Sequence, residues 1–247
     1  GVSTSKDERW ILLTASSKTS TGVWLVDAAA PAGAPVPVVV RRDGVLADVE
    51  PYAGGLLITH NAARANFQVS WAPLPGGPNP DEWVDLDWSD PDELVQGVEA
   101  FDTFVSLSLR SGGRPGLRIV PIAADVRDVG RGGGVGGFGS AHDVAVAGET
   151  VVVATGVTPD PTSTTVQVVL ESLAAPPAVY DYDVVAQSFT LLKSRRVPGY
   201  DLSRLRERRL WATAPDGARI PISLVWRADV EPDGTAPGLL SGYGAYG

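Results

Sequence analysis

Short apolar runs that alternate with polar residues dominate this sequence, and they end at turn-forming residues. Val36, Val38 and Val40 are spaced by two, as are the apolar positions in 67–71 and in 105–109. A two-residue period places successive side chains on opposite faces of a strand. With 28 Gly and 20 Pro in 247 residues, turns are frequent. The sequence therefore predicts a mainly β chain with many short strands, as in a sandwich, barrel or propeller.

Helical signals are weak. Residues 89–93 resemble a helix start, because Ser89 can cap and acidic residues follow it. The residues after them, up to Phe101, have little helical periodicity. A second segment, Ser203 to Leu210, has room for one or two helical turns.

The apolar runs gather into clusters at a loose period of about 40–50 residues, which is close to the length of a propeller blade. The clusters are Trp10–Arg41, Val45–Leu86, Val98–Val126 and Asp143–Leu192. No short signature such as Trp-Asp recurs at this period. The pattern alone is compatible with a propeller and leaves the other β folds open.

Charge and composition exclude several classes of protein. The net charge is −9, and residues 1–190 carry 23 acidic against 11 basic residues. Such an acidic body disfavours nucleic acid and anionic membranes as partners. The sequence has no apolar run long enough to span a bilayer and no basic start followed by an apolar run, so we expect a cytoplasmic protein. The absence of cysteine excludes disulfides and thiolate chemistry.

Candidate chemical groups are few. His60 and His142 are the two histidines, and Asp143 follows the second. Residues 132–137 match G-x-G-x-x-G, but no helix is predicted after them, so we reject a nucleotide site. No G-x-S-x-G nucleophile motif occurs, and no metal-ligand spacing is present. Basic residues are concentrated in 193–209 without a periodic platform of aromatics, which indicates a solvated, domain-facing stretch.

The last fifty residues resemble a known family. The order LWATAPDGARIPISLVWRADV, then DGTAPGLLSGYGAYG, is similar to the entry to the hydrolase domain of the prolyl oligopeptidase family of serine peptidases. The segments VPGYD and IPISLVWR resemble the oligopeptidase B branch most. Upstream, STSKDERW resembles a blade opening, and VYDYD resembles the segment before the hydrolase domain.

This resemblance implies an architecture. It implies a partial seven-bladed β-propeller, of about four later blades, over residues 1–196. Residues 197–247 then correspond to the first strands of an α/β-hydrolase domain. The chain starts with Gly and stops after a glycine cluster, so we expect an internal fragment of a longer protein. The catalytic Ser, Asp and His are expected beyond Gly247.

The resemblance also implies a function. The parent is expected to cleave short peptides after Lys or Arg by acyl transfer, without a cofactor or a metal. Its expected partners are short basic peptides and the remainder of the same polypeptide. Two alternatives remain open, namely a prolyl oligopeptidase that cuts after proline and a non-catalytic propeller that serves as a binding module.

One site residue carries over from the family. In the family's YGYG motif, the second tyrosine supplies a hydroxyl to the oxyanion hole, and it aligns with Tyr243 in Gly242-Tyr243-Gly244. The first tyrosine is replaced by Ser241. Tyr243 is therefore the expected oxyanion donor.

Overall fold

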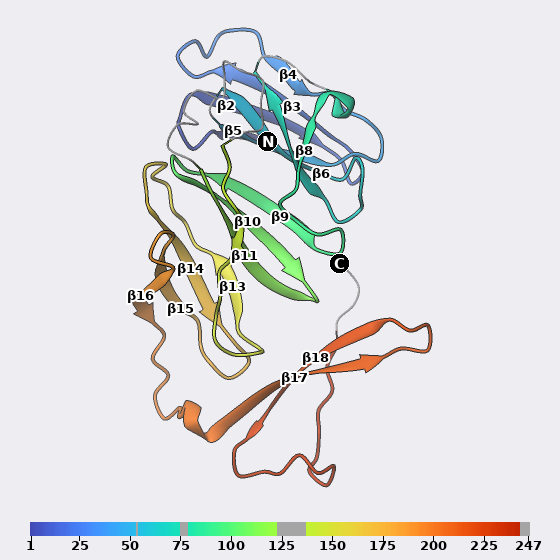
Figure 1. Ribbon diagram of the computed structural model, residues 1–247, viewed down its shortest axis with the longest axis vertical. Coiled ribbons are helices and arrows are strands. Elements are labelled where there is room, and N and C mark those ends of the chain that lie inside the picture. The colour runs from blue at the N-terminus through green and yellow to red at the C-terminus, as the bar shows by residue number, and fades with distance from the viewer. Residues whose placement is uncertain (53, 75–78, 123–136, 243–247) are drawn as a thin grey trace.

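Four antiparallel sheets of four strands follow one another along the chain, and a two-stranded hairpin comes after them. Figure 1 shows this order in a computed structural model, from the blue sheet at the N-terminus to the orange hairpin. The structure describes residues 1–52, 54–74, 79–122 and 137–242.

Each sheet is a simple antiparallel meander, because strands that are consecutive in the chain pair side by side. The strands of the first two sheets are β1 (Val2–Thr4), β2 (Trp10–Ser16), β3 (Thr21–Asp27), β4 (Val36–Val39), β5 (Ala47–Tyr52), β6 (Gly55–His60), β7 (Gln68–Pro73) and β8 (Val84–Leu86). Those of the next two are β9 (Leu94–Ala100), β10 (Phe104–Ser111), β11 (Arg114–Pro121), β12 (His142–Asp143), β13 (Val152–Thr155), β14 (Thr165–Glu171), β15 (Ala178–Asp183) and β16 (Ser188–Ser194). The hairpin consists of β17 (Leu205–Thr213) and β18 (Arg219–Arg227).

The hydrophobic core lies between the sheets. One apolar cluster joins the first and second sheets and includes Leu25 and Ile58. A second joins the second and third sheets and includes Leu57 and Leu107. A third cluster joins the third and fourth sheets around Phe104 and Val168. Strand β6 is buried at every position because sheets cover both of its faces. The two-residue alternation of the sequence thus becomes face-to-face packing of successive blades.

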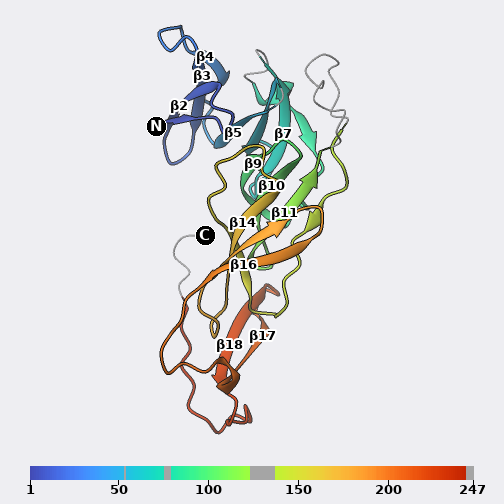
Figure 2. The ribbon, with the colours of Figure 1, turned by 90° about the vertical axis from the view of Figure 1, so that its left-hand side faces the viewer.

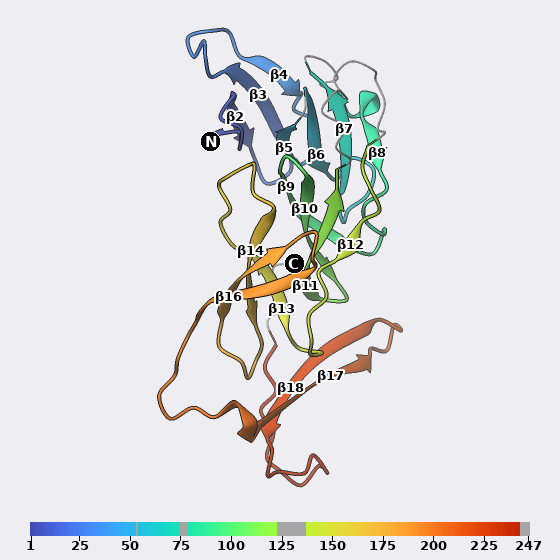
Figure 3. The same ribbon diagram turned by 60° about the vertical axis from the view of Figure 1, so that its left-hand side comes forward.

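The first strands of the sheets end near one another. Residues just after β1, the ends of β5 and β9, and Pro161 beyond β13 line one cavity. The hairpin β17–β18 lies at the other end of the blades, beside the β10–β11 turn at Gly112 and Gly113. Figures 2 and 3 show the hairpin below the third and fourth sheets, away from the blue first sheet. The blades therefore have two distinct ends, one facing the hairpin and one facing away from it.

The prediction of a mainly β chain with propeller-like blades is confirmed. The blade limits differ in detail, because the first sheet starts at Val2 and the third at Leu94. The helix start suggested at 89–93 is wrong. There the Glu93 carboxylate accepts the Asp90 N–H at 2.9 Å, as in a helix cap, but the chain then enters β9. Within 203–210, only a 3-10 turn (η3, Leu202–Arg204) forms before β17.

Candidate functional site

Lys6 connects three blades at the end that faces away from the hairpin. Its ammonium lies 2.8 Å from Glu99 Oε2 in the third sheet and donates to the Thr158 carbonyl, beyond β13, at 2.9 Å. It also lies 3.6 Å from the centroid of the buried Phe101 ring. The Lys6 side chain is 13% exposed, so these contacts replace most of its hydration.

Glu50, on β5 of the second sheet, lies beside this group of contacts. Its carboxylate accepts a hydrogen bond from the backbone N–H of Ala100 at 3.4 Å, which is long for a charge-assisted bond. Burial raises the pKa of Glu50 from 4.5 to about 7, although Lys6 and the Ala100 N–H oppose this shift. Glu50 therefore changes its charge near neutral pH.

We name Lys6, Glu50, Glu99, Phe101 and Thr158 the axial cluster, because they meet where the first strands of the four sheets converge. A cavity of about 240 Å³ lies beside it and is lined by Lys6, Glu50 and the buried Phe101. Asp7 and Asp102 stand at its exposed edge. The arrangement combines a small cavity, one ammonium and several carboxylates.

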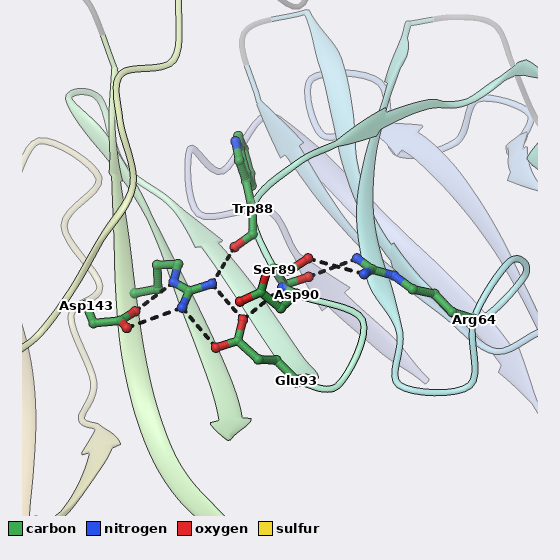
Figure 4. A network of polar contacts seen from close by, with 7 residues as sticks. Arg64, Trp88, Ser89, Asp90, Glu93 and Asp143 are labelled. Carbon is green, nitrogen blue, oxygen red and sulfur yellow. Dashed lines mark hydrogen bonds and ion pairs between the residues drawn. The ribbon is translucent and has the colours of Figure 1, made fainter. Parts of the chain in front are cut away.

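A second charged group lies at the opposite end of β9 and is drawn in Figure 4. Arg118, on β11, contacts Glu93 with two nitrogens at 2.7 and 2.9 Å and Asp143 at 2.7 and 3.3 Å. It also donates to the Trp88 carbonyl at 2.9 Å. These bonds, led by the one to Asp143, raise the pKa of Arg118, so it stays charged. Every carboxylate oxygen in this group has a partner.

Arg64 contacts the same connecting segment from the second sheet. Its guanidinium donates to the Ser89 carbonyl and hydroxyl at 3.2 and 3.0 Å. Two arginines from neighbouring blades therefore hold residues 88–93, the segment that leads from β8 to β9. We name Arg118, Glu93, Asp143 and Arg64 the linker network, and its satisfied geometry indicates a structural role.

His60 does not form a catalytic triad. Its Nε2 lies 2.6 Å from the Ser70 hydroxyl, which donates to Asp85 at 2.7 Å. The His60 Nδ1 accepts the Ala62 backbone N–H at 3.2 Å, so Nε2 carries the proton and donates to Ser70. Ser70 is fully buried, and burial lowers the pKa of His60. Ser70 accepts from His60 and donates to Asp85, so the imidazole cannot take the serine proton, and this buried hydroxyl has no nucleophilic role.

The other predicted candidates also stay apart. His142 lies 3.5 Å from the Tyr182 hydroxyl, while Asp143 binds Arg118 instead of orienting the imidazole. Of the glycine motif 132–137, only Gly137 belongs to the described residues. Tyr243 lies outside the described residues, and its oxyanion role stays a prediction.

The hairpin contacts the blades through side chains that alternate along β17. Glu207 accepts bonds from the Ser172 hydroxyl at 2.8 Å and the Ala174 N–H at 2.7 Å, both on the β14–β15 turn. The Arg209 backbone N–H donates to Glu149 at 3.0 Å, and its guanidinium donates to the Gly112 carbonyl. Part of the basic stretch 193–209 therefore contacts the blades, in keeping with the prediction of a solvated, domain-facing stretch.

Sequence reasoning missed the axial cluster and the linker network. The signal was present as charges inside largely apolar strands: Glu50 in ADVEPY, Glu99 in LVQGVEA and Arg118 in RPGLRIVP. A charge in such a position is buried only with a partner. Which partner it takes depends on residues 25 to 93 positions away, which no local pattern reveals.

Within the part of the chain that the structure describes, no group of three or more His, Asp or Glu side chains is arranged to hold a metal ion. No helix among these residues has the length and apolar character needed to cross a bilayer.

Comparison with known proteins gives the same architecture. Residues 1–195 match the family model described as the N-terminal β-propeller domain of prolyl oligopeptidase. Over its full length the chain is 30% identical to dipeptidyl aminopeptidase BI of Pseudoxanthomonas mexicana and 27% identical to protease 2 of Moraxella lacunata. It spans 32% and 33% of these two proteins, about a third of their length.

Solved structures agree on the fold. Oligopeptidase B from Trypanosoma brucei, in a closed form with covalently bound antipain, superposes with a TM-score of 0.80 at 21% identity. Oligopeptidase B from Leishmania major superposes with a TM-score of 0.78 at 22% identity. Each alignment covers 94% of this chain and 32% of the other.

Proposed function

The chain belongs to the prolyl oligopeptidase family, through its N-terminal β-propeller domain, and from this membership we propose that it is part of a serine peptidase that hydrolyses short peptides after Lys or Arg. The observation that carries the proposal is the match of residues 1–195 to that domain. In this proposal residues 1–196 form about four later blades, and 197–247 form the first strands of an α/β-hydrolase domain. The nucleophile, acid and base lie beyond Gly247.

The preference for basic peptides draws on the charge of the blades. Residues 1–190 carry 23 acidic and 11 basic residues, and a surface of one sign concentrates ligands of the other. The named structural neighbours are oligopeptidases B, which supports the same branch of the family. The relative with 30% identity is a dipeptidyl aminopeptidase, and release of dipeptides from the amino end is therefore the second candidate.

The test is a product analysis with the intact polypeptide. Matched peptides that differ only in one residue, Arg, Lys, Pro or Ala, are incubated with the enzyme, and the products are identified by mass spectrometry. Internal cleavage after Arg and Lys supports the proposal. Cleavage after Pro favours a prolyl oligopeptidase, and stepwise loss of dipeptides favours the aminopeptidase. Absence of cleavage and of labelling by a serine-directed phosphonate favours a binding module.

Tyr243 is proposed to donate its hydroxyl to the oxyanion of the tetrahedral intermediate. Because the negative charge develops only in the transition state, a donor placed there lowers the barrier. Tyr243→Phe is expected to lower kcat on the order of 100-fold with little change in KM. Tyr246→Phe removes a hydroxyl from the same glycine segment and is the matched control, with near-normal kcat. A kcat within about twofold of wild type for Tyr243→Phe contradicts the role.

The 247-residue chain alone is proposed to be inactive, because without a nucleophile no acyl-enzyme forms. Its partner is the remainder of the same polypeptide, and exposed apolar residues on the hairpin, such as Leu210 and Ile220, provide a surface for it. Sedimentation of the isolated chain is expected to show association, and a stable monomer argues against this. A cytoplasmic location is also proposed, and cell fractionation tests it.

A further inference from the structure

The axial cluster joins segments from all four blades. Lys6 follows β1, Glu50 lies on β5, Glu99 and Phe101 lie at the end of β9, and Thr158 follows β13. At the same place, two hydrogen bonds donated by backbone N–H groups cross between blades. The Ala100 N–H donates to Glu50 at 3.4 Å, and the Asp102 N–H donates to the Pro161 carbonyl at 2.8 Å. The geometry of the axial cluster therefore determines how closely the blade ends approach one another.

The charged groups around Glu50 are mostly acidic. On its own strand stand Asp48 and the titratable Tyr52; on β9 stands Glu99, followed by Asp102. After β1 come Lys6 and Asp7, and the segment beyond β13 carries Asp160 beside Pro161. Lys6 is thus one cation among several carboxylates, and it already contacts Glu99 and the Thr158 carbonyl.

We propose that the axial cluster is a proton-operated switch, in which the charge of Glu50 decides whether Lys6 holds the blade ends together. With Glu50 neutral, the Lys6 ammonium stays on Glu99, the Thr158 carbonyl and the Phe101 ring. With Glu50 ionised, a second carboxylate in the same cavity competes for that ammonium and draws in water. The contacts of Lys6 with the third and fourth blades then weaken, and the blade ends separate.

Three structural observations support this direction. The cavity of about 240 Å³ beside Glu50 has room for water. The bond from the Ala100 N–H to Glu50 is long, so the ionised carboxylate is poorly compensated where it stands. The Lys6 ammonium, from the first blade, contacts Glu99 in the third blade and the Thr158 carbonyl beyond β13, so a bond to Glu50 in the second blade competes with these contacts. This switch goes beyond the proposed peptidase function and does not depend on it.

Hydrogen exchange of the intact polypeptide tests the proposal without an activity assay. Exchange is followed by mass spectrometry at pH 6 and pH 8, one unit on either side of the Glu50 pKa of about 7. The reporter is the peptide 98–104, which contains the amides of Ala100 and Asp102. Variants are compared at the same pH, because the intrinsic exchange rate then cancels.

Glu50→Gln keeps the neutral form at both pH values. At the higher pH, the wild-type reporter is expected to exchange on the order of tenfold faster than that of Glu50→Gln. At the lower pH the two are expected to agree within about twofold. Lys6→Met removes the bridging ammonium. Its reporter peptide is therefore expected to exchange faster than that of Glu50→Gln at both pH values.

Asp48→Asn is the matched control, because it removes a neighbouring acid on the same strand, and it is expected to behave like wild type. Equal exchange of wild type and Glu50→Gln at the higher pH overturns the proposal. It is also overturned if Asp48→Asn removes the pH response as fully as Glu50→Gln. If Glu50→Gln does not fold, the test uses wild type alone. The exchange rate of peptide 98–104 is then divided by the exchange rate of the turn 172–177 at each pH. A ratio that stays the same at both pH values overturns the switch.

Discussion

The two ends of strand β9 carry charged groups of similar composition and different behaviour. At its start, Glu93 is 7% exposed and contacts two nitrogens of Arg118, at 2.7 and 2.9 Å. At its end, the axial cluster places Glu50 near Lys6, yet the hydrogen bond from the Ala100 N–H to Glu50 is 3.4 Å long. Hydrogen bonds to Asp143 and Glu93 raise the pKa of Arg118 in the first group, so Arg118 stays charged, whereas burial raises the pKa of Glu50 to about 7.

The difference shows that burial alone does not decide whether a carboxylate stabilises a connection between blades or responds to pH. A guanidinium has five donors in a fixed plane and can satisfy two carboxylates and a carbonyl together, as Arg118 does. An ammonium is a compact charge with three donors, and Lys6 directs two of its bonds to Glu99 and the Thr158 carbonyl. The arginine group therefore stabilises the connection between blades, and the lysine group leaves one acid sensitive to pH.

The largest effect is expected from removing one partner of the linker network. Glu93→Ala leaves Arg118 buried with Asp143, which is 64% exposed, as its remaining carboxylate. Breaking a buried pair in this way costs about 3–5 kcal/mol of the free energy of unfolding. Thermal unfolding is expected to shift down by roughly 10 °C. The double variant Glu93→Leu/Arg118→Met leaves no buried unpaired charge, because Asp143 is 64% exposed to water, and it is expected to recover part of this loss.

The second-largest change in the free energy of unfolding is expected at Glu50, and the shifted pKa gives its direction. Its pKa rises from 4.5 to about 7 on folding, so its stabilising contribution is complete below about pH 4.5 and is lost as the pH rises through 7. Glu50→Gln is therefore expected to stabilise the protein above neutral pH by on the order of 3 kcal/mol, and by little near pH 5. Denaturant unfolding at several pH values measures this. An equal shift at every pH contradicts the titration of Glu50.

A smaller effect is expected from Lys6→Met. Methionine keeps the apolar stem but removes the ammonium from Glu99 and the Phe101 ring. Because Glu99 is 38% exposed, water replaces part of the lost contact, and the expected loss is about 1–2 kcal/mol. Lys6→Arg is the control that retains the charge. If Lys6→Met were as costly as Glu93→Ala, the two ends of β9 would not differ as described.

The smallest effect is expected from Asp143→Asn. This side chain is 64% exposed, and exposed ion pairs contribute less than about 1 kcal/mol. The amide oxygen still accepts one bond from Arg118. A loss above about 2 kcal/mol in thermal unfolding would show that Asp143, and not Glu93, is the dominant partner of Arg118.

Local pattern was sufficient for the strands. The alternation of Phe67, Val69 and Trp71 predicts a strand, and β7 spans Gln68–Pro73. Local pattern was misleading at 89–93, where Glu93 caps Asp90 as in a helix start but its carboxylate also binds Arg118 on β11. The apolar residues that follow pack between two sheets, and this packing outweighs the local preference.

The β class, the blade-like period and, through the last fifty residues, the family can be predicted from the sequence. Which charges meet depends on tertiary packing. Lys6 and Glu99 are 93 positions apart, and Lys6 and Thr158 are 152 apart. Alternation depends on neighbours two residues away, and it can therefore be read along the chain. The charge of Glu50 depends on how much water and how many donors remain around it once four separate blades have packed together.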